Sequence, residues 1–123
     1  MGRSVIVEMP YTGKELSVNH YLGRTRRGGV YVKGEVLKWK EVLGWQIKTS
    51  HIEDWNLPLT VMCDGQFSDK RSQPDLSNLS KIILDAIEES CGVNDRNMRW
   101  QDGVSTIDKE EEPMLLITIK EVE

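Results

Sequence analysis

The chain has 123 residues, of which 38% are hydrophobic and 29% charged, and its formal net charge is −4. These values predict one soluble globular domain over residues 1–123 with a single core. No apolar run approaches the roughly 18 residues of a membrane span, and the first residues lack a signal-peptide pattern, so we expect a cytoplasmic protein without a membrane partner. Cys63 and Cys91 lack metal-ligand spacing, and free buried thiols are typical of a reducing compartment.

The charges are unevenly distributed. Residues 14–48 carry eight Lys/Arg against three Glu, whereas residues 49–123 carry seven Lys/Arg against sixteen Asp/Glu. A basic first half and an acidic second half fit a segment that binds phosphate groups next to a metal site. The alternative is that the charges form an ordinary solvated surface.

The first part of the chain predicts one strand and a long polar loop. Residues 3–9 alternate in polarity as a strand does, and Pro10 closes it. The tip of the following loop, which spans residues 11–29, contains three arginines among glycines: Arg24, Arg26 and Arg27. Arginine matches phosphate geometry bidentately, so this tip suits a flexible phosphate contact; a basic surface loop without a ligand fits the same composition.

The middle of the chain predicts a helix and a second strand. A short extended piece over residues 30–32 leads to an amphipathic helix from residue 35 to about residue 50. Pro58 begins a strand whose residues alternate in polarity up to Asp64. A polar loop over residues 65–73, which contains Lys70 and Arg71, follows.

Residues 74–95 form the most informative stretch. Apolar residues recur there at three- and four-residue steps, which predicts one stripe of an amphipathic helix: Leu79, Ile82, Ile83, Ala86 and Ile87. Asp75 stands at the helix entrance as a cap, and Gly92 ends the helix. The polar side carries Asn78, Lys81 and Asp85. We expect the exit loop to fold Asp95 back toward this side, which would bring carboxylates together as in many magnesium sites.

The last part of the chain predicts two strands, residues 98–107 with an interruption near Gly103 and residues 114–122, joined by an acidic turn. The order β, α, β, α, β, β predicts an α+β fold. We expect a single small domain in which two helices pack on a mixed sheet of about four strands.

Two blocks of the sequence resemble a known family. The run from Asp75 to Lys81 reads Asp-Leu-Ser-Asn-Leu-Ser-Lys, Asp85 begins Asp-Ala-Ile, and Gly92 begins Gly-Val-Asn-Asp. This resembles the RusA-type Holliday-junction endonucleases, whose helix reads Asp-Leu-Asp-Asn-Leu-x-Lys, followed by Asp-Ala-Leu and a glycine-containing turn ending in Asp-Asp. The segment from Ser17 to Tyr21 is similar to the family's N-terminal Ser-x-Asn block. Length, block order and spacing agree over most of the chain.

The resemblance implies the same architecture and a metal-dependent, structure-specific endonuclease that resolves four-way (Holliday) junctions in DNA recombination and repair. It implies Mg²⁺ as cofactor, with Mn²⁺ as a substitute, and branched DNA as partner. A four-way junction has two symmetric strands to cut, so a homodimer presents one active site to each. Small resolvases of this type are often associated with phages and prophages.

The resemblance also assigns roles to single residues. Asp75 and Asp95 are the expected metal ligands, and Lys81 is expected to pair with the scissile phosphate or orient the attacking water. Asn78 would hold a ligand or loop in place, and Asp85 would fix Lys81 from one turn away. The expected DNA contacts lie in the loops: Asn19, Arg24, Arg26, Arg27, Lys70 and Arg71. His20 also fits a metal or catalytic role, although a lone loop histidine is more often structural.

Two departures from the family pattern leave alternatives open. Ser77 stands where the family has an aspartate, and Asn94-Asp95 stands for its paired aspartates. Since a hydroxyl is a poorer Mg²⁺ ligand than a carboxylate, the site either works with one metal, helped by Asp64, Asp69 or Asp102, or binds junctions without cutting them. A third reading is a small acidic interaction protein whose motif helix packs a dimer.

Overall fold

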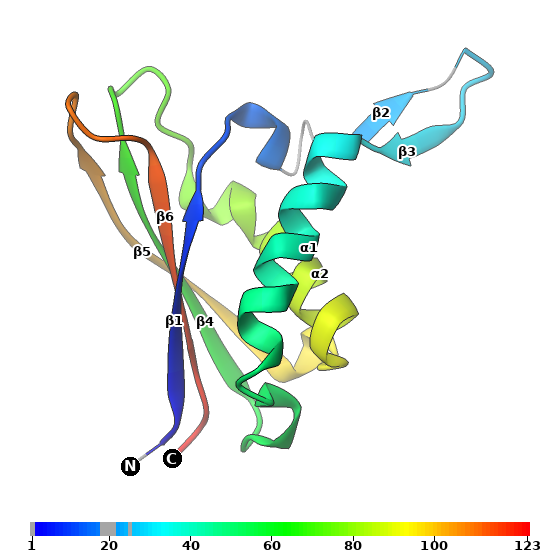
Figure 1. Ribbon diagram of the computed structural model, residues 1–123, viewed down its shortest axis with the longest axis vertical. Helices are drawn as coiled ribbons and strands as arrows, with labels where there is room; N and C mark the ends of the chain where they lie inside the picture. Colours follow the sequence, from blue (N-terminus) through cyan, green and yellow to red (C-terminus); the bar gives the residue numbers. More distant parts are fainter. Residues whose placement is uncertain (1, 18–21, 25) are drawn as a thin grey trace.

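The computed structural model describes residues 2–17, 22–24 and 26–123, and it has the predicted α+β architecture. Two helices and a four-stranded sheet form the body of the molecule (Figure 1). The helices are α1 (Gly34–Lys48) and α2 (Ser80–Cys91). The strands of the sheet are β1 (Ser4–Pro10), β4 (Leu59–Phe67), β5 (Met98–Ile107) and β6 (Met114–Lys120). Within the described residues, no helix is both long and apolar enough to cross a membrane.

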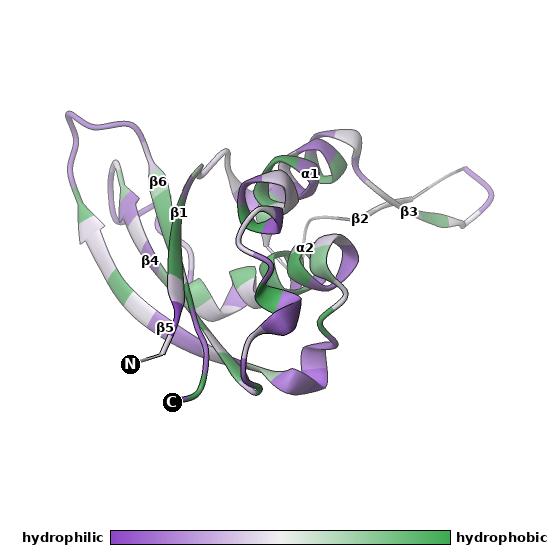
Figure 2. Ribbon diagram, turned by 60° about the horizontal axis from the view of Figure 1, so that its bottom comes forward, coloured by the Kyte–Doolittle hydropathy of each residue, from purple (hydrophilic) through white to green (hydrophobic). Residues whose placement is uncertain are grey.

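The sheet is mixed, with strand order β1-β6-β4-β5. β6 pairs antiparallel with β1 and β4, whereas β4 and β5 are parallel. Parallel neighbours need a crossover, and α2 supplies it between β4 and β5. Figures 1 and 2 show α1 and α2 on the same side of the sheet, so the other side has no helical cover.

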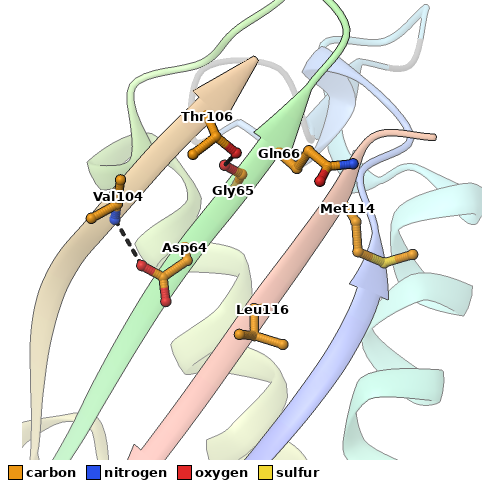
Figure 3. Close-up of a pocket in the computed structure, with 7 residues that line it drawn as sticks. All are labelled: Asp64, Gly65, Gln66, Val104, Thr106, Met114 and Leu116. Atoms are coloured by element: carbon orange, nitrogen blue, oxygen red, sulfur yellow. Dashed lines mark hydrogen bonds between the residues drawn. The ribbon is translucent and has the colours of Figure 1, made fainter. Parts of the chain in front are cut away.

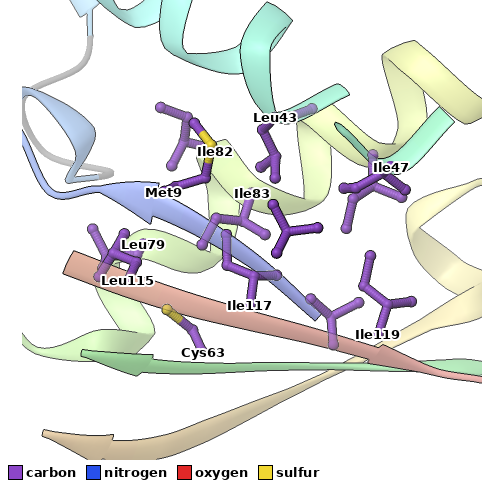
Figure 4. Packing of buried hydrophobic residues seen from close by; sticks show 14 of the residues in the cluster. Met9, Leu43, Ile47, Cys63, Leu79, Ile82, Ile83, Leu115, Ile117 and Ile119 are labelled. Atoms are coloured by element: carbon purple, nitrogen blue, oxygen red, sulfur yellow. The ribbon is translucent and has the colours of Figure 1, made fainter. Parts of the chain in front are cut away.

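The core lies between this sheet and the two helices. β4 alternates strictly between buried and half-buried residues, as the sequence predicts for a half-buried strand. Figure 4 shows Leu43 and Ile47 of α1, Ile83 of α2 and Ile117 of β6 meeting in this layer. Each fully buried aliphatic side chain contributes about 1.5–3 kcal/mol, so these contacts hold α2, and with it the motif, against the sheet.

A glycine allows α1 and α2 to approach closely. A Cβ atom on Gly44 would lie 2.7 Å from Cβ of Ser90, which is closer than real contacts allow. Beside this contact, the buried Lys40 pairs with Glu89, their charged atoms 2.8 Å apart. α2 ends as the sequence predicts, because Gly92 adopts the left-handed conformation with φ 76° and donates to the Glu88 carbonyl.

Three sequence predictions need correction. β4 continues to Phe67, although a loop was predicted from residue 65, because the Phe67 ring is fully buried in the core. The predicted loop of residues 11–29 contains a 3₁₀ turn, η1 (Lys14–Leu16), and strand β2 (Leu22–Arg24), which pairs with β3 (Val30–Val32). The predicted motif helix begins as a separate 3₁₀ turn, η3 (Leu76–Leu79), before α2. Figure 1 shows the β2–β3 hairpin projecting from the start of α1.

The predicted interruption near Gly103 is a β-bulge in a continuous strand. The register of β4 and β5 shifts so that Asp64 alone lies opposite Gly103 and Val104. The Val104 amide donates to Oδ1 of Asp64 at 2.7 Å, a bond drawn in Figure 3. The side chain of Asp64 therefore satisfies the backbone group that the bulge frees from the ladder.

Candidate functional site

Asp75 caps the 3₁₀ turn that leads into α2. Its backbone is extended, and its Oδ1 accepts hydrogen bonds from the Ser77 amide at 3.1 Å and the Ser77 hydroxyl at 2.9 Å. The predicted cap is therefore present, although it serves η3 rather than the first turn of α2. Oδ2 of Asp75 makes no hydrogen bond to the described residues, and the side chain is exposed. One oxygen of this carboxylate is thus oriented by the protein and the other faces solvent.

The other polar residues of the motif follow on η3 and α2. Asn78 is half-buried, and Lys81 Nζ lies 3.2 Å from Oδ1 of Asp85, as predicted for a pair one turn apart. The side chains of Lys81 and Asp85 are 50% and 22% exposed, and a pair one helical turn apart in such a position contributes about a few tenths of a kcal/mol to stability. Its main effect is to restrict the positions that the Lys81 ammonium group visits.

Asp95 lies at the other end of α2. It begins a short 3₁₀ turn, η4 (Asp95–Asn97), which Asn94 caps by accepting from the Arg96 amide at 3.1 Å. Asp75 precedes α2 and Asp95 follows it, and twelve helical residues rise about 18 Å. Figure 1 shows the two turns at opposite ends of the helix. Since Mg²⁺ holds its ligands at about 2.1 Å, one chain does not bring these two predicted ligands to a common ion.

The three other carboxylates considered in the sequence have different positions. Asp64 points to the helix-free side of the sheet, where it lines a hollow of about 270 Å³ that contains no cationic side chain (Figure 3). Asp69 closes a turn before the motif, and hydrogen bonds from the Ser72 amide and hydroxyl lower the pKa of its carboxyl group. Asp102 is the register partner of the inward-facing Cys63, so it lies on the helix side of β5, the strand that contacts η3. Oδ1 of Asp102 accepts a hydrogen bond from Trp100 Nε1 at 2.6 Å, which orients this carboxylate too.

Among the described residues, one cluster has three grouped ligand atoms, those of His51, Glu53 and Asp54, and the motif has none. All three side chains are exposed, and His51 Nδ1 lies 3.3 Å from Oε1 of Glu53. These residues form the turn after α1 and are not connected to the motif. Exposed acidic groups of this kind are common without a metal.

The cysteines offer no nucleophile: burial raises the pKa of the Cys63 thiol to about 12.

A polar cleft adjoins the motif. It has a volume of about 440 Å³ and lies between the segment after β1 and the segment that enters η3. Its lining comprises Tyr11, Gly13, Lys14, Ser17, Arg71, Ser72, Gln73, Pro74 and Asn78. Arg71 and Asn78 were singled out from the sequence, and Ser17 belongs to the N-terminal block that resembles the family. Tyr11 and Lys14 also line the cleft but were not singled out from the sequence; for Lys14 the only signal was the excess of positive charge over residues 14–48.

The predicted DNA contacts fall in three places. Arg71 lines the cleft, and Lys70 is exposed in the same loop. Arg26 and Arg27 are exposed in the turn of the β2–β3 hairpin, and Arg24 pairs with Val30 next to this turn. Asn19 and His20 lie outside the described residues.

Comparison with protein-family models found no match, and comparison with curated proteins found none either, so the functional argument rests on the residues themselves.

Proposed function

We propose that the protein is a Mg²⁺-dependent, structure-specific DNA endonuclease that binds and cuts four-way junctions. One observation supports this function above others: an oriented carboxylate, Asp75, belongs to the segment that borders a cleft with two cations in its lining. Asp75 lies between Pro74 and Asn78, which both line the cleft, and Lys14 and Arg71 contribute positive charge to it. Carboxylate beside cation is the combination that phosphodiester hydrolysis needs, because one group holds a metal and the other a phosphate.

The residues present fit a magnesium ion that is held weakly by one or two carboxylates better than an ion whose ligands all come from the protein. Mg²⁺ usually keeps several waters and binds one or two carboxylates together with substrate phosphate oxygens. Asp75 would hold it through the oxygen that makes no bond to the described residues, and Asp102 is the candidate second carboxylate. The bound ion would activate a water molecule and stabilise negative charge on the phosphate.

The remaining residues of the chain have roles in binding and orientation. The Ser77 hydroxyl fixes the rotation of the Asp75 carboxylate. Lys14 and Arg71 offset the charge of the DNA backbone in the cleft, and the arginines of the hairpin would contact phosphates farther along the strand. Lys81, held by Asp85, is the candidate partner of the scissile phosphate. A homodimer would present one such site to each of the two strands cut in a junction.

A second candidate function, junction binding without cleavage, has its own support. Ser77 uses its hydroxyl to bind Asp75, and Asp95 lies beyond the far end of α2. The number of carboxylates near the cleft is therefore lower than in the family's pattern. The third reading, a small acidic interaction protein, requires no nucleic-acid binding at all.

Incubation with a labelled synthetic four-way junction, with and without Mg²⁺, separates these functions. A linear duplex of the same sequence is the substrate control. We expect Mg²⁺-dependent cutting of the junction by the parent and loss of cutting with retained binding in Asp75→Asn. Asp64→Asn is the matched control, because it changes a carboxylate on the other side of the sheet and keeps an oxygen to accept from Val104.

Each result has one interpretation. Binding by parent and variant without cutting at any Mg²⁺ concentration would establish the binding-only function. Equal cutting by the parent and Asp75→Asn would remove Asp75 from the site. Absence of both binding and cutting would leave the interaction protein.

A further inference from the structure

The two charged residues that line the cleft, Lys14 and Arg71, are both cations. Lys14 comes from η1, and Arg71 comes from the loop before η3, so each wall contributes one cation. Both side chains are exposed, and neither forms an ion pair with the residues that the structure describes. No carboxylate belongs to the cleft lining, although Glu15 lies beside Gly13 and Tyr11, and Asp69 and Asp75 lie close in sequence to Arg71. The charge of the lining itself therefore favours an anion.

An aromatic ring is fixed on the same wall as Lys14. The Tyr11 ring lies edge-to-face with the buried Phe67, with ring centroids 5.2 Å apart and an interplanar angle of 88°. The Tyr11 amide also donates to the Pro113 carbonyl at 3.2 Å, which anchors the backbone of this residue. A fixed aromatic side chain next to cations is the arrangement on which proteins stack the bases of single-stranded nucleic acid.

The size of the cleft restricts what can enter. A volume of about 440 Å³ is at the scale of pockets that enclose one small organic group and too small for the width of a duplex. The amides of Gln73 and Asn78 add donors and acceptors of the kind that read base edges. A single unpaired nucleotide matches this combination of size, charge, aromatic surface and amides.

We propose that the cleft binds one unpaired nucleotide, with its base against Tyr11 and its phosphate between Lys14 and Arg71. This inference rests on the proposed function, because it takes the bound nucleotide to belong to DNA. It adds to that function a preference for a strand whose bases are unstacked. Branch points supply such nucleotides at lower cost than a continuous duplex, because base stacking is interrupted at the point of strand exchange and the base pairs there open more easily. The nucleotide next to the bond that is cut would thus be held beside Asp75.

The test is fluorescence anisotropy of a short labelled oligothymidylate and of a labelled hairpin duplex, in EDTA so that no metal contributes. We expect the parent to prefer the single strand. Lys14→Gln and Arg71→Gln together should reduce the slope of log affinity against log salt by about 0.7, the change expected when one phosphate of a single strand is no longer neutralised, and each variant alone should reduce it by part of that amount. Lys120→Gln is the control, because it removes an exposed cation at the end of β6, whereas Tyr11 is bonded next to the start of β6. This variant should leave both the affinity and the slope unchanged.

Tyr11 is tested by a pair of variants. Tyr11→Leu should weaken oligothymidylate binding at least about fivefold, and Tyr11→Phe, which keeps the ring, should bind like the parent. Because Tyr11 packs on Phe67, thermal melts establish that each variant is folded; if Tyr11→Leu is not, the two charge variants decide alone. Equal affinity for duplex and single strand, or charge variants indistinguishable from Lys120→Gln, would overturn the inference.

Failure of this inference is separable from failure of the proposed function. Asp75→Asn should bind oligothymidylate at least as tightly as the parent does, since it removes a negative charge near the bound phosphate and no cation of the cleft. Cutting of junctions without a single-strand preference would refute only the nucleotide cleft. A single-strand preference that depends on Lys14 and Arg71, without cutting of any junction, would refute only the nuclease.

Discussion

The hydroxyl of Ser77 donates a hydrogen bond to Oδ1 of Asp75 at 2.9 Å, and the amide of Ser77 donates to the same oxygen at 3.1 Å. Ser77 therefore orients the Asp75 carboxylate, at the position where the family's pattern has a second carboxylate. Both bonds go to one oxygen, so the other is left to face solvent. Replacing this donor by an acid changes the site in a defined way, since an ionised carboxylate only accepts hydrogen bonds.

Ser77→Asp should tighten Mg²⁺ binding. Without metal, two carboxylates a few ångströms apart repel by about 1 kcal/mol in a water-like environment, so we expect the melting temperature to fall by roughly 3 °C. Addition of Mg²⁺ should recover that loss, and less Mg²⁺ should be needed for junction cutting. Melts and cleavage across a Mg²⁺ series measure both effects.

Ser77→Asn is the matched control, because it adds similar bulk without charge. Its melting temperature should not respond to Mg²⁺ more than that of the parent. If the aspartate variant responds no more than the asparagine variant, residue 77 is not near a metal.

The separation of Asp75 and Asp95 by α2 predicts unequal effects of two further changes. Asp102→Asn should raise the Mg²⁺ concentration needed for cutting, because Asp102 lies on the helix side of β5, which contacts η3. Asp95→Asn should leave that concentration unchanged, because Asp95 begins η4 at the other end of the helix. Cleavage over a Mg²⁺ series measures both variants. Loss of cutting in a folded Asp95→Asn protein would instead show that Asp95 of a second copy reaches the site.

The hairpin arginines should make binding sensitive to salt. Arg26 and Arg27 are exposed in the turn of the projecting β2–β3 hairpin (Figure 1), and Arg24 belongs to the strand pair next to that turn. Replacing all three with alanine should weaken junction binding at low salt. The plot of log affinity against log salt should flatten by about 0.9 for each phosphate of the duplex arms that the variant no longer neutralises. An unchanged slope would exclude the hairpin from the interface.

Glu121 should stabilise the fold in a pH-dependent way. Its carboxylate is buried, accepts from Arg3 Nε at 2.8 Å and the Asn56 amide at 2.9 Å, and has its pKa lowered from 4.5 to about 2 by these bonds, that to Arg3 being the larger cause. A lowered pKa in the folded state gives stability that is complete above about pH 4.5 and is lost as the pH falls toward 2.

Glu121→Gln tests this through urea unfolding at several pH values. The variant should be less stable than the parent near neutral pH, and the difference should shrink between about pH 4.5 and pH 2, where the parent's carboxylate becomes protonated. A difference that does not vary with pH would mean that packing, rather than the ion pair with Arg3, is what the variant loses.

Gly103→Ala should destabilise the sheet by about 1–3 kcal/mol. A Cβ atom at this position would lie 2.7 Å from the Cys63 carbonyl oxygen and still closer to Oδ1 of Asp64. Asp64→Ala relieves only the second of these clashes, so the double variant should recover part of the loss and no more. Denaturant unfolding of the two single variants and the double variant gives the coupling between them. A full recovery would show that the backbone of β4 moves freely at the bulge.

Local periodicity was enough to predict most of the elements. The three- and four-residue spacing of Ile82, Ile83 and Ala86 predicts α2, and the alternation around Val61 predicts β4, because a single face of each is buried. Gly92 marks the end of α2 since few other residues adopt a positive φ. The cap formed by Asp75 and the pairing of Lys81 with Asp85 were likewise predictable, because both partners lie within one turn of chain.

Contacts between distant parts of the chain determined the features that the sequence did not predict: the length of β4, the separation of Asp75 from Asp95 and the position of the cleft. β4 extends to Phe67 because that ring is buried in the core. The polar residues around Phe67 in the sequence predict a loop instead. The exit loop of α2 leads directly into β5, so the rise of the helix keeps Asp95 away from Asp75, whatever their spacing in the motif. The cleft has Lys14 on one wall and Arg71 on the other because the segment that follows β1 lies beside the segment that leads into η3. Sequence spacing determines neighbours within an element, and only the tertiary structure determines which elements end side by side.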